Sequence, residues 1–218
     1  MRIRNAFVLL PLVMATGLAL AAEPKVQAVS ALPASIPGVI AGALQASGNR
    51  VLAADASPVA EIWLRKDLPV SGQKEVEGAN YPALTPGILV GVILFSTPGK
   101  DFRSQQVKPG TYAMRYELLP NDGNHMGVAP DRDFLLLVPV ADDPGPAKTL
   151  PYQELVKLSS RAAGTSHPAV FSMPAVDKRD LPAAYADPNG YIVFAGQLGT
   201  TAGNLPVALI VKGVSMSF

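Results

Sequence analysis

The sequence predicts an all-β protein, an antiparallel β-sandwich of the jelly-roll or immunoglobulin-like kind with one or two short helices. Eight short segments are either apolar throughout or alternate between apolar and polar residues, and turn-forming residues separate them at fairly regular spacing. The 21 prolines and 19 glycines, in a chain that is 49% hydrophobic, also indicate short elements joined by many turns. Because the strands do not alternate with helices, the pattern favours a sandwich over a parallel sheet.

The first residues predict export from the cytoplasm. Arg2 and Arg4 precede an apolar run over residues 6–20, and small residues follow it. A positive end, a short apolar middle and a small-residue exit are typical of a secretory signal peptide. We expect cleavage after Ala21 or Ala22, which places the mature chain in the periplasm or outside the cell with no stable membrane anchor. A transmembrane anchor is disfavoured because the run is shorter than a bilayer requires.

Composition excludes several functional classes. The chain has no cysteine, so a disulfide framework, a thiol nucleophile, thiolate metal ligands and a lipoprotein anchor are all excluded. Its 18 basic and 17 acidic side chains form no long block of one sign, which argues against nucleic-acid binding. The length predicts residues 1–21 as signal peptide, 22–48 as an N-terminal arm or short helix, and 49–218 as a single sandwich domain.

The first half of the mature chain contains two predicted strands and a long loop. Residues 39–44 are consistent with a short helix closed by Gly48, or with a loose arm. Segments 50–54 and 60–65 alternate as half-buried strands do, with Trp63 on the face opposite Ile62. Residues 71–86, which are polar and rich in Gly and Pro, predict a long surface loop that either connects strands or binds a ligand.

The middle of the chain contains the strands that the sequence marks most clearly. Residues 88–96 are apolar on both faces, as in a strand buried between two layers, with Gly91 at a bulge or a close backbone approach. Residues 111–119 alternate, so we expect the face bearing Arg115 and Glu117 to be in contact with water. Residues 133–140 form another strand that is apolar on both faces.

One helix and three more strands are predicted in the C-terminal part. The helix begins after Pro151 and ends near residue 163, where Gly164 can cap it. Its predicted apolar side contains four residues: Tyr152, Leu155, Val156 and Ser159. Strands are expected over residues 169–173, 191–198 and 206–214, with turn chemistry at 187–190 and 199–204.

The densest polar segment, residues 120–133, lies between two predicted strands and presents His125. In one interpretation its polar residues only stabilise the turn. In the other, His125, Met126, Asp131 and Arg132 bind a ligand, with Trp63 as a further contact. Imidazole and carboxylate are also metal ligands, which makes His125, Asp122, Asp131 and Asp133 candidates for a divalent metal site. Their spacing matches no dedicated metal motif, so no cofactor is firmly implied.

The sequence assigns no catalytic residue. It has no Gly-x-Ser-x-Gly elbow, and Ser166 beside His167 is adjacency in sequence rather than the geometry of a catalytic triad. A triad assembled from distant segments stays open. Catalysis is therefore less expected than binding.

Three stretches resemble a family of exported bacterial proteins of unknown function. They are residues 60–69 (AEIWLRKDLP), 108–139 (KPGTYAMRYELLPNDGNHMGVAPDRDFLLLVP) and 167–175 (HPAVFSMPA). The resemblance implies an exported location and a sandwich fold, and it carries over no functional residue.

The leading hypothesis is a ligand- or partner-binding module of the cell envelope, which would bind a small ligand or another envelope protein. The alternative is a metal-dependent hydrolase or metal-handling protein that uses the His125 loop.

Overall fold

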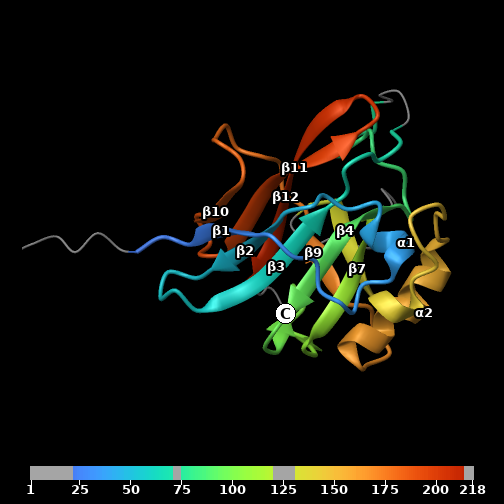
Figure 1. The fold of residues 1–218 in the computed structure, drawn as a ribbon, viewed down its shortest axis with the longest axis horizontal. Helices are drawn as coiled ribbons and strands as arrows, with labels where there is room; N and C mark the ends of the chain where they lie inside the picture. The colour runs from blue at the N-terminus through green and yellow to red at the C-terminus, as the bar shows by residue number, and fades with distance from the viewer. Residues whose placement is uncertain (1–21, 71–74, 120–130, 214–218) are drawn as a thin grey trace, which may run out of the picture.

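A seven-stranded antiparallel sheet forms the centre of the protein (Figure 1). The computed structural model describes residues 22–70, 75–119 and 131–213. In this sheet the strands lie in the order β1-β2-β3-β4-β7-β8-β9. Their bounds are β1 Lys25–Val29, β2 Gly48–Leu52, β3 Pro58–Leu64, β4 Leu89–Phe95, β7 Gly110–Leu118, β8 Asp133–Pro139 and β9 Val170–Ser172. Neighbours in the sheet follow one another along the chain, apart from a small excursion through β5 (Gly99–Lys100) and β6 (Gln106–Val107), which pair with each other.

A second sheet packs on one face of the large one. It contains β10 (Ala183–Ala186), β11 (Ile192–Thr200) and β12 (Gly203–Lys212), again antiparallel. Ile93 and Met114 from the large sheet meet Phe194 and Leu209 from the small sheet in one buried apolar cluster. This inter-sheet core establishes the predicted fold class, an all-β antiparallel sandwich.

The helices cover the opposite face of the large sheet (Figure 1). Helices α1 (Gly38–Ala41) and α2 (Tyr152–Ala163), with the 3-10 turn η1 (Val140–Asp142), lie over this face. Ile40 and Leu155 pack there against Trp63, Val92 and Leu136. The central strands are therefore buried on both sides, as their continuous apolar sequences predict.

The predicted wet face of residues 111–119 is wrong. Ala113 and Arg115 are fully buried in β7, and Glu117 is only 5% exposed. Alternation of charged and apolar residues is typical of a strand with one face in water, which is why the face bearing Arg115 and Glu117 was expected to be exposed. The charged side chains instead point toward the helix-covered face, where Arg115 finds buried partners.

All eight predicted strands are present, as β2, β3, β4, β7, β8, β9, β11 and β12. Four further strands were not predicted. Among them, β1 turns the expected N-terminal arm into part of the sheet, because it pairs with β2 from Lys25↔Leu52 to Val29↔Gly48. Most of its residues are exposed, so it carries no apolar pattern. The others, β5, β6 and β10, have only two to four residues each.

Local details of the prediction are confirmed in β4 and α2. The pairing of β4 with β7 shifts register between Leu89 and Gly91, and a Cβ on Gly91 would lie 2.3 Å from the Trp63 carbonyl oxygen. Helix α2 starts after Pro151, and Gly164 caps its end in the left-handed conformation (φ 65°). Tyr152, which was expected on the apolar side, is 49% exposed. No helix in the described ranges is long and apolar enough to cross a membrane.

Candidate functional site

The predicted ligand loop is only partly described. His125, Met126 and Asp122 lie in residues 120–130, outside the described residues. Asp131, Arg132 and Asp133 are described and lie at the start of β8. The binding and metal roles of His125 therefore stay predictions. Within the described part of the chain, no three His, Asp or Glu side chains are grouped in a way that could hold a metal ion.

Asp133 is a buried structural acceptor. Its Oδ2 accepts the Asn80 N–H at 2.7 Å, and its Oδ1 accepts the Tyr81 N–H at 3.0 Å and the Tyr116 hydroxyl at 2.7 Å. The side chain has no exposed surface. These three donors hold the segment before β4 against β7 and β8, and they occupy the carboxylate that was predicted as a metal ligand.

Asp131 and Arg132 also make structural contacts. Asp131 accepts hydrogen bonds from Asn80 Nδ2 (3.1 Å) and Ser172 Oγ (3.2 Å), and burial raises the pKa of its carboxyl. Arg132 donates from Nε and Nη2 to the Leu119 carbonyl oxygen, at 3.0 and 2.7 Å, and from Nη1 to the Glu77 carbonyl oxygen. These bonds tie together the chain on either side of the undescribed segment.

Trp63 does not face solvent. It is fully buried in the helix-side core, where its indole ring lies directly over Gly48, so close that a Cβ there would be 2.4 Å from ring atoms. As a ligand-contacting aromatic residue Trp63 is corrected to a core residue, because its strand face is covered by the α1 segment rather than left open. Its Nε1 has no hydrogen-bond partner among the described residues.

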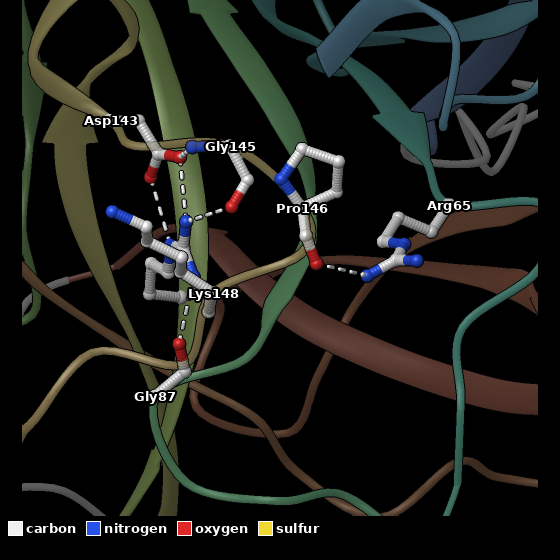
Figure 2. A network of polar contacts seen from close by, with 7 residues as sticks. Arg65, Gly87, Asp143, Gly145, Pro146 and Lys148 are labelled. Atoms are coloured by element: carbon white, nitrogen blue, oxygen red, sulfur yellow. Dashed lines mark hydrogen bonds and ion pairs between the residues drawn. The ribbon is translucent and has the colours of Figure 1, made fainter. Parts of the chain in front are cut away.

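A buried arginine network joins β7 to the segment between η1 and α2 (Figure 2). Arg115 projects from β7 and uses all five of its N–H groups. Nε and Nη2 donate to the two carboxylate oxygens of Asp143 at 2.8 and 2.6 Å. Nη2 also donates to the Gly145 carbonyl, and Nη1 donates to the carbonyls of Gly87 and Lys148. Arg115 thereby fixes the segment that joins η1 to α2.

Arg65 lies beyond the same segment, on the other side of Pro146 (Figure 2). It directly follows β3 and is 5% exposed. Its Nη1 donates to the Pro146 carbonyl at 3.3 Å, and its Nη2 is 3.6 Å from Asp67 Oδ1. Burial lowers the pKa of Arg65, Asp67 opposes this shift, and the positive charge of Arg115 adds to it. The sequence presents the partner segment only as a Pro- and Gly-rich turn, so neither arginine was predicted as part of a network.

An open cleft of about 970 Å³ lies at one end of the sandwich, between the two sheets. Residues 22–24, the β2–β3 turn and the connection from β4 to β5 line it on one side. The β10–β11 turn and the end of β12 line it on the other. These segments are turns and strand ends far apart in sequence, and no pattern in the sequence brings them together.

The cleft has an apolar floor and a charged rim. Phe95, Ile192 and Val211 line it and are at least nine-tenths buried. Lys100, Lys212, Glu23 and Asp55 are its charged lining residues. Asp55 accepts hydrogen bonds from the Ser57 hydroxyl (2.6 Å) and N–H (2.9 Å), which lower the pKa of its carboxyl, and the charge of Lys212 acts in the same direction.

Comparisons of the chain with protein-family models, with curated proteins and with solved structures give no match. The resemblance to exported bacterial proteins therefore stays a prediction.

Proposed function

We propose that this chain is an exported binding protein that holds a small amphipathic molecule in the cleft between its two sheets. The observation that carries the proposal is the cleft itself, an open space of about 970 Å³ to which both sheets contribute. Sites for small ligands are typically concave spaces of about 300–1,000 Å³, mostly apolar, with a few polar groups that fix orientation. The predicted signal peptide supports a location outside the cytoplasm.

The lining favours a ligand with an apolar body and a polar end. The buried side chains of Phe95, Ile192 and Val211 give the floor no charge to pair with. An apolar group placed there would gain about 25 cal/mol for each Å² of surface removed from water. Polar contacts are available at the rim, where Lys100 and Lys212 supply donors and Asp55 and Glu23 supply acceptors.

Asp55, one of the acidic groups at the described rim, is suited to binding rather than to acid–base catalysis. A general acid or base works best with a pKa near the operating pH, which an enzyme usually achieves by burial. The Asp55 carboxylate is instead exposed, and its hydrogen bonds to Ser57 lower its pKa. The group is therefore ionised at neutral pH and suits an electrostatic contact with a ligand.

The test is to fill the cleft without disturbing the core. Ala186 is exposed at the end of β10 and lines the cleft, so Ala186→Trp would occupy part of the space. Ala202→Trp is the matched control, because Ala202 is also exposed but lies in the β11–β12 turn, away from the cleft. The mature protein and both variants would be titrated with dodecanoate and, separately, with dodecylammonium by isothermal calorimetry, below the concentrations at which these probes form micelles.

We expect saturable one-to-one binding of at least one probe to the parent protein and to Ala202→Trp, and binding weakened about tenfold or more by Ala186→Trp, which corresponds to about 1.4 kcal/mol. Equal affinity in all three proteins would place the probe elsewhere. Failure of both probes to bind the parent protein would overturn the proposed ligand class. Thermal unfolding of each variant checks that the fold is retained.

A further inference from the structure

We propose that Arg65 is a second ligand site, independent of the cleft, which binds an oxyanion such as a carboxylate or a phosphate. The site is the edge of the guanidinium formed by Nε and Nη2. A carboxylate or phosphate fits that edge because two of its oxygens match the two parallel N–H groups of the planar fork. Four observations lead to this site: the neighbouring Arg115, the unused donors of Arg65, the local excess of positive charge, and the position of Asp67.

Arg115 is a buried arginine of this protein in which every side-chain N–H group has an acceptor. Its Nε and Nη2 bind the two oxygens of the Asp143 carboxylate, at 2.8 and 2.6 Å. Its remaining N–H groups donate to the carbonyl oxygens of Gly87, Gly145 and Lys148. The guanidinium is fully buried, and each of its donors has an acceptor. The Asp143 carboxylate thus binds the edge of Arg115 formed by Nε and Nη2. In Arg65 we assign the equivalent edge to an oxyanion.

Arg65 is almost as deeply buried, but within the part of the chain that the structure describes it lacks the acceptors that Arg115 has for each of its N–H groups. Its Nε is buried and has no acceptor in residues 22–70, 75–119 or 131–213. Its Nη2 lies 3.6 Å from Asp67 Oδ1, which is longer than a hydrogen bond. Of the side-chain nitrogens of Arg65, Nη1 alone has an acceptor at hydrogen-bond distance in the described part of the chain, the Pro146 carbonyl at 3.3 Å. A buried charged group with unused donors is costly, so the edge favours an added acceptor.

The charges around the two arginines do not balance. Both guanidinium groups donate to the segment from Asp143 to Lys148. Asp143 neutralises Arg115 with both of its oxygens. Among the described residues, Arg65 has an ion pair with Asp67 alone, whose side chain is 62% exposed and therefore largely hydrated. A bound oxyanion would supply the negative charge that Asp143 supplies to Arg115.

Asp67 also shows which end of the edge approaches solvent: it is Nη2, whereas Nε is buried. Since its exposed carboxylate lies close to Nη2, that side of Arg65 is near the protein surface. An anion arriving there would meet repulsion from Asp67, which competes for the same edge. Removal of the Asp67 charge should therefore strengthen anion binding. Arg50, which already has a carboxylate partner in Glu61 at 2.6 Å, should be insensitive to the anion.

The test follows the arginine side chains directly. The mature protein, labelled with ¹⁵N, would be titrated with acetate and with phosphate at constant ionic strength, with chloride as the reference anion. The Nε–H signals of the arginines are the readout, and that of Arg65 is assigned by its loss in Arg65→Lys. We expect a saturable shift of the Arg65 signal with one or both oxyanions, no such shift with chloride, and no saturable shift of the Arg50 signal.

Asp67→Asn keeps the proposal falsifiable if Arg65→Lys fails to fold, because the changed charge 3.6 Å from Nη2 shifts the Arg65 Nε–H signal and so assigns it. We expect this variant to bind the same anion about fivefold more tightly, because a like charge beside the site has been removed. Saturation by acetate but not phosphate, or the reverse, would identify which oxyanion the edge accepts. The proposal is overturned if the Arg65 signal does not respond to either oxyanion in the parent protein. This includes the case in which only Asp67→Asn responds, because Asp67 would then be the partner of this edge in the parent protein.

Discussion

Arg115 and Asp143 form a two-pronged ion pair from which solvent is excluded: both side chains are 0% exposed, and Nη2 lies 2.6 Å from Oδ1. Arg115 belongs to β7 at the centre of the large sheet, whereas Asp143 lies in an irregular segment after η1. The pair therefore anchors the chain that leads into α2 to the helix-covered face of the sheet.

Asp143→Asn should destabilise the protein strongly. The variant leaves the Arg115 guanidinium buried without a compensating charge, and breaking a buried pair in this way costs about 3–5 kcal/mol. Urea unfolding would measure the loss. Glu61→Gln is the control, because the side chain of its partner Arg50 is 44% exposed and pairs at the surface are worth less than about 1 kcal/mol. Similar losses in both variants would show that Asp143 does not have the anchoring role inferred here.

Asp133→Asn should also destabilise the protein, by about 2–3 kcal/mol. In the parent protein, donors of Asn80, Tyr81 and Tyr116 share the two carboxylate oxygens of Asp133. The amide of the variant keeps one acceptor oxygen but places an NH₂ group against these donors. Asp131→Asn, the same change two residues away, should cost less because Asp131 is partly exposed and accepts two side-chain hydrogen bonds from described residues, against three bonds to Asp133. The free energies of unfolding of the two variants, measured at neutral pH, would show whether Asp133→Asn is the more destabilising change.

The stability of the protein should depend on pH through Glu117. Burial raises the pKa of its carboxyl to about 7. The folded state therefore holds the proton more tightly than the unfolded state does, and the contribution of Glu117 to stability falls as the pH rises from about 4.5 to about 7, then levels off. Since one pKa unit corresponds to about 1.4 kcal/mol, this loss amounts to about 3 kcal/mol at most.

Glu117→Gln cannot ionise and should escape that loss. Its stability relative to the parent protein should increase between pH 4.5 and 7, as measured by urea unfolding at several pH values. Asp101 and Asp131, whose pKa values burial also raises, remain in both proteins, so their effects cancel in the difference. A difference that stays constant over this range would mean that Glu117 is already ionised at low pH in the folded protein.

Gly48→Ala should disrupt the helix-side core. An added Cβ would lie 2.4 Å from the Trp63 ring, and overpacking of this kind costs about 1–3 kcal/mol. Gly38→Ala makes the same chemical change in α1, where a Cβ would meet nothing within 4 Å. Thermal unfolding should show a lower midpoint for the first variant and little change for the second. Equal midpoints would mean that the indole ring can move aside at low cost.

Much of the fold could be predicted because burial leaves a pattern in the sequence. The strands around Val92 and Leu136 are apolar on both faces, since a sheet or a helix covers each side. Strand β1 has no such pattern because it is exposed at the edge, and β10 is only four residues long. The buried side of β7 was mistaken for a wet one because Arg115 satisfies its charge with partners distant in sequence.

The candidate sites were harder to predict, since each depends on segments that only the fold brings together. The cleft combines turns from both sheets, and the Arg65 guanidinium donates through Nη1 to the Pro146 carbonyl, 81 residues away in the chain. The polar segment before β8 was predicted to bind a ligand, and most of it lies outside the described residues. Asp131, Arg132 and Asp133, however, make hydrogen bonds that hold the structure together.

The position of Trp63 has a practical consequence for following the unfolding of this protein. It is the only tryptophan in the chain and belongs to the layer under the helices, whereas Tyr81, Tyr112 and Tyr116 belong to the layer between the sheets. Tryptophan emission is thus an optical label for one layer alone. A red shift of that emission that precedes the loss of far-ultraviolet circular dichroism would reveal that the helices detach before the sandwich opens.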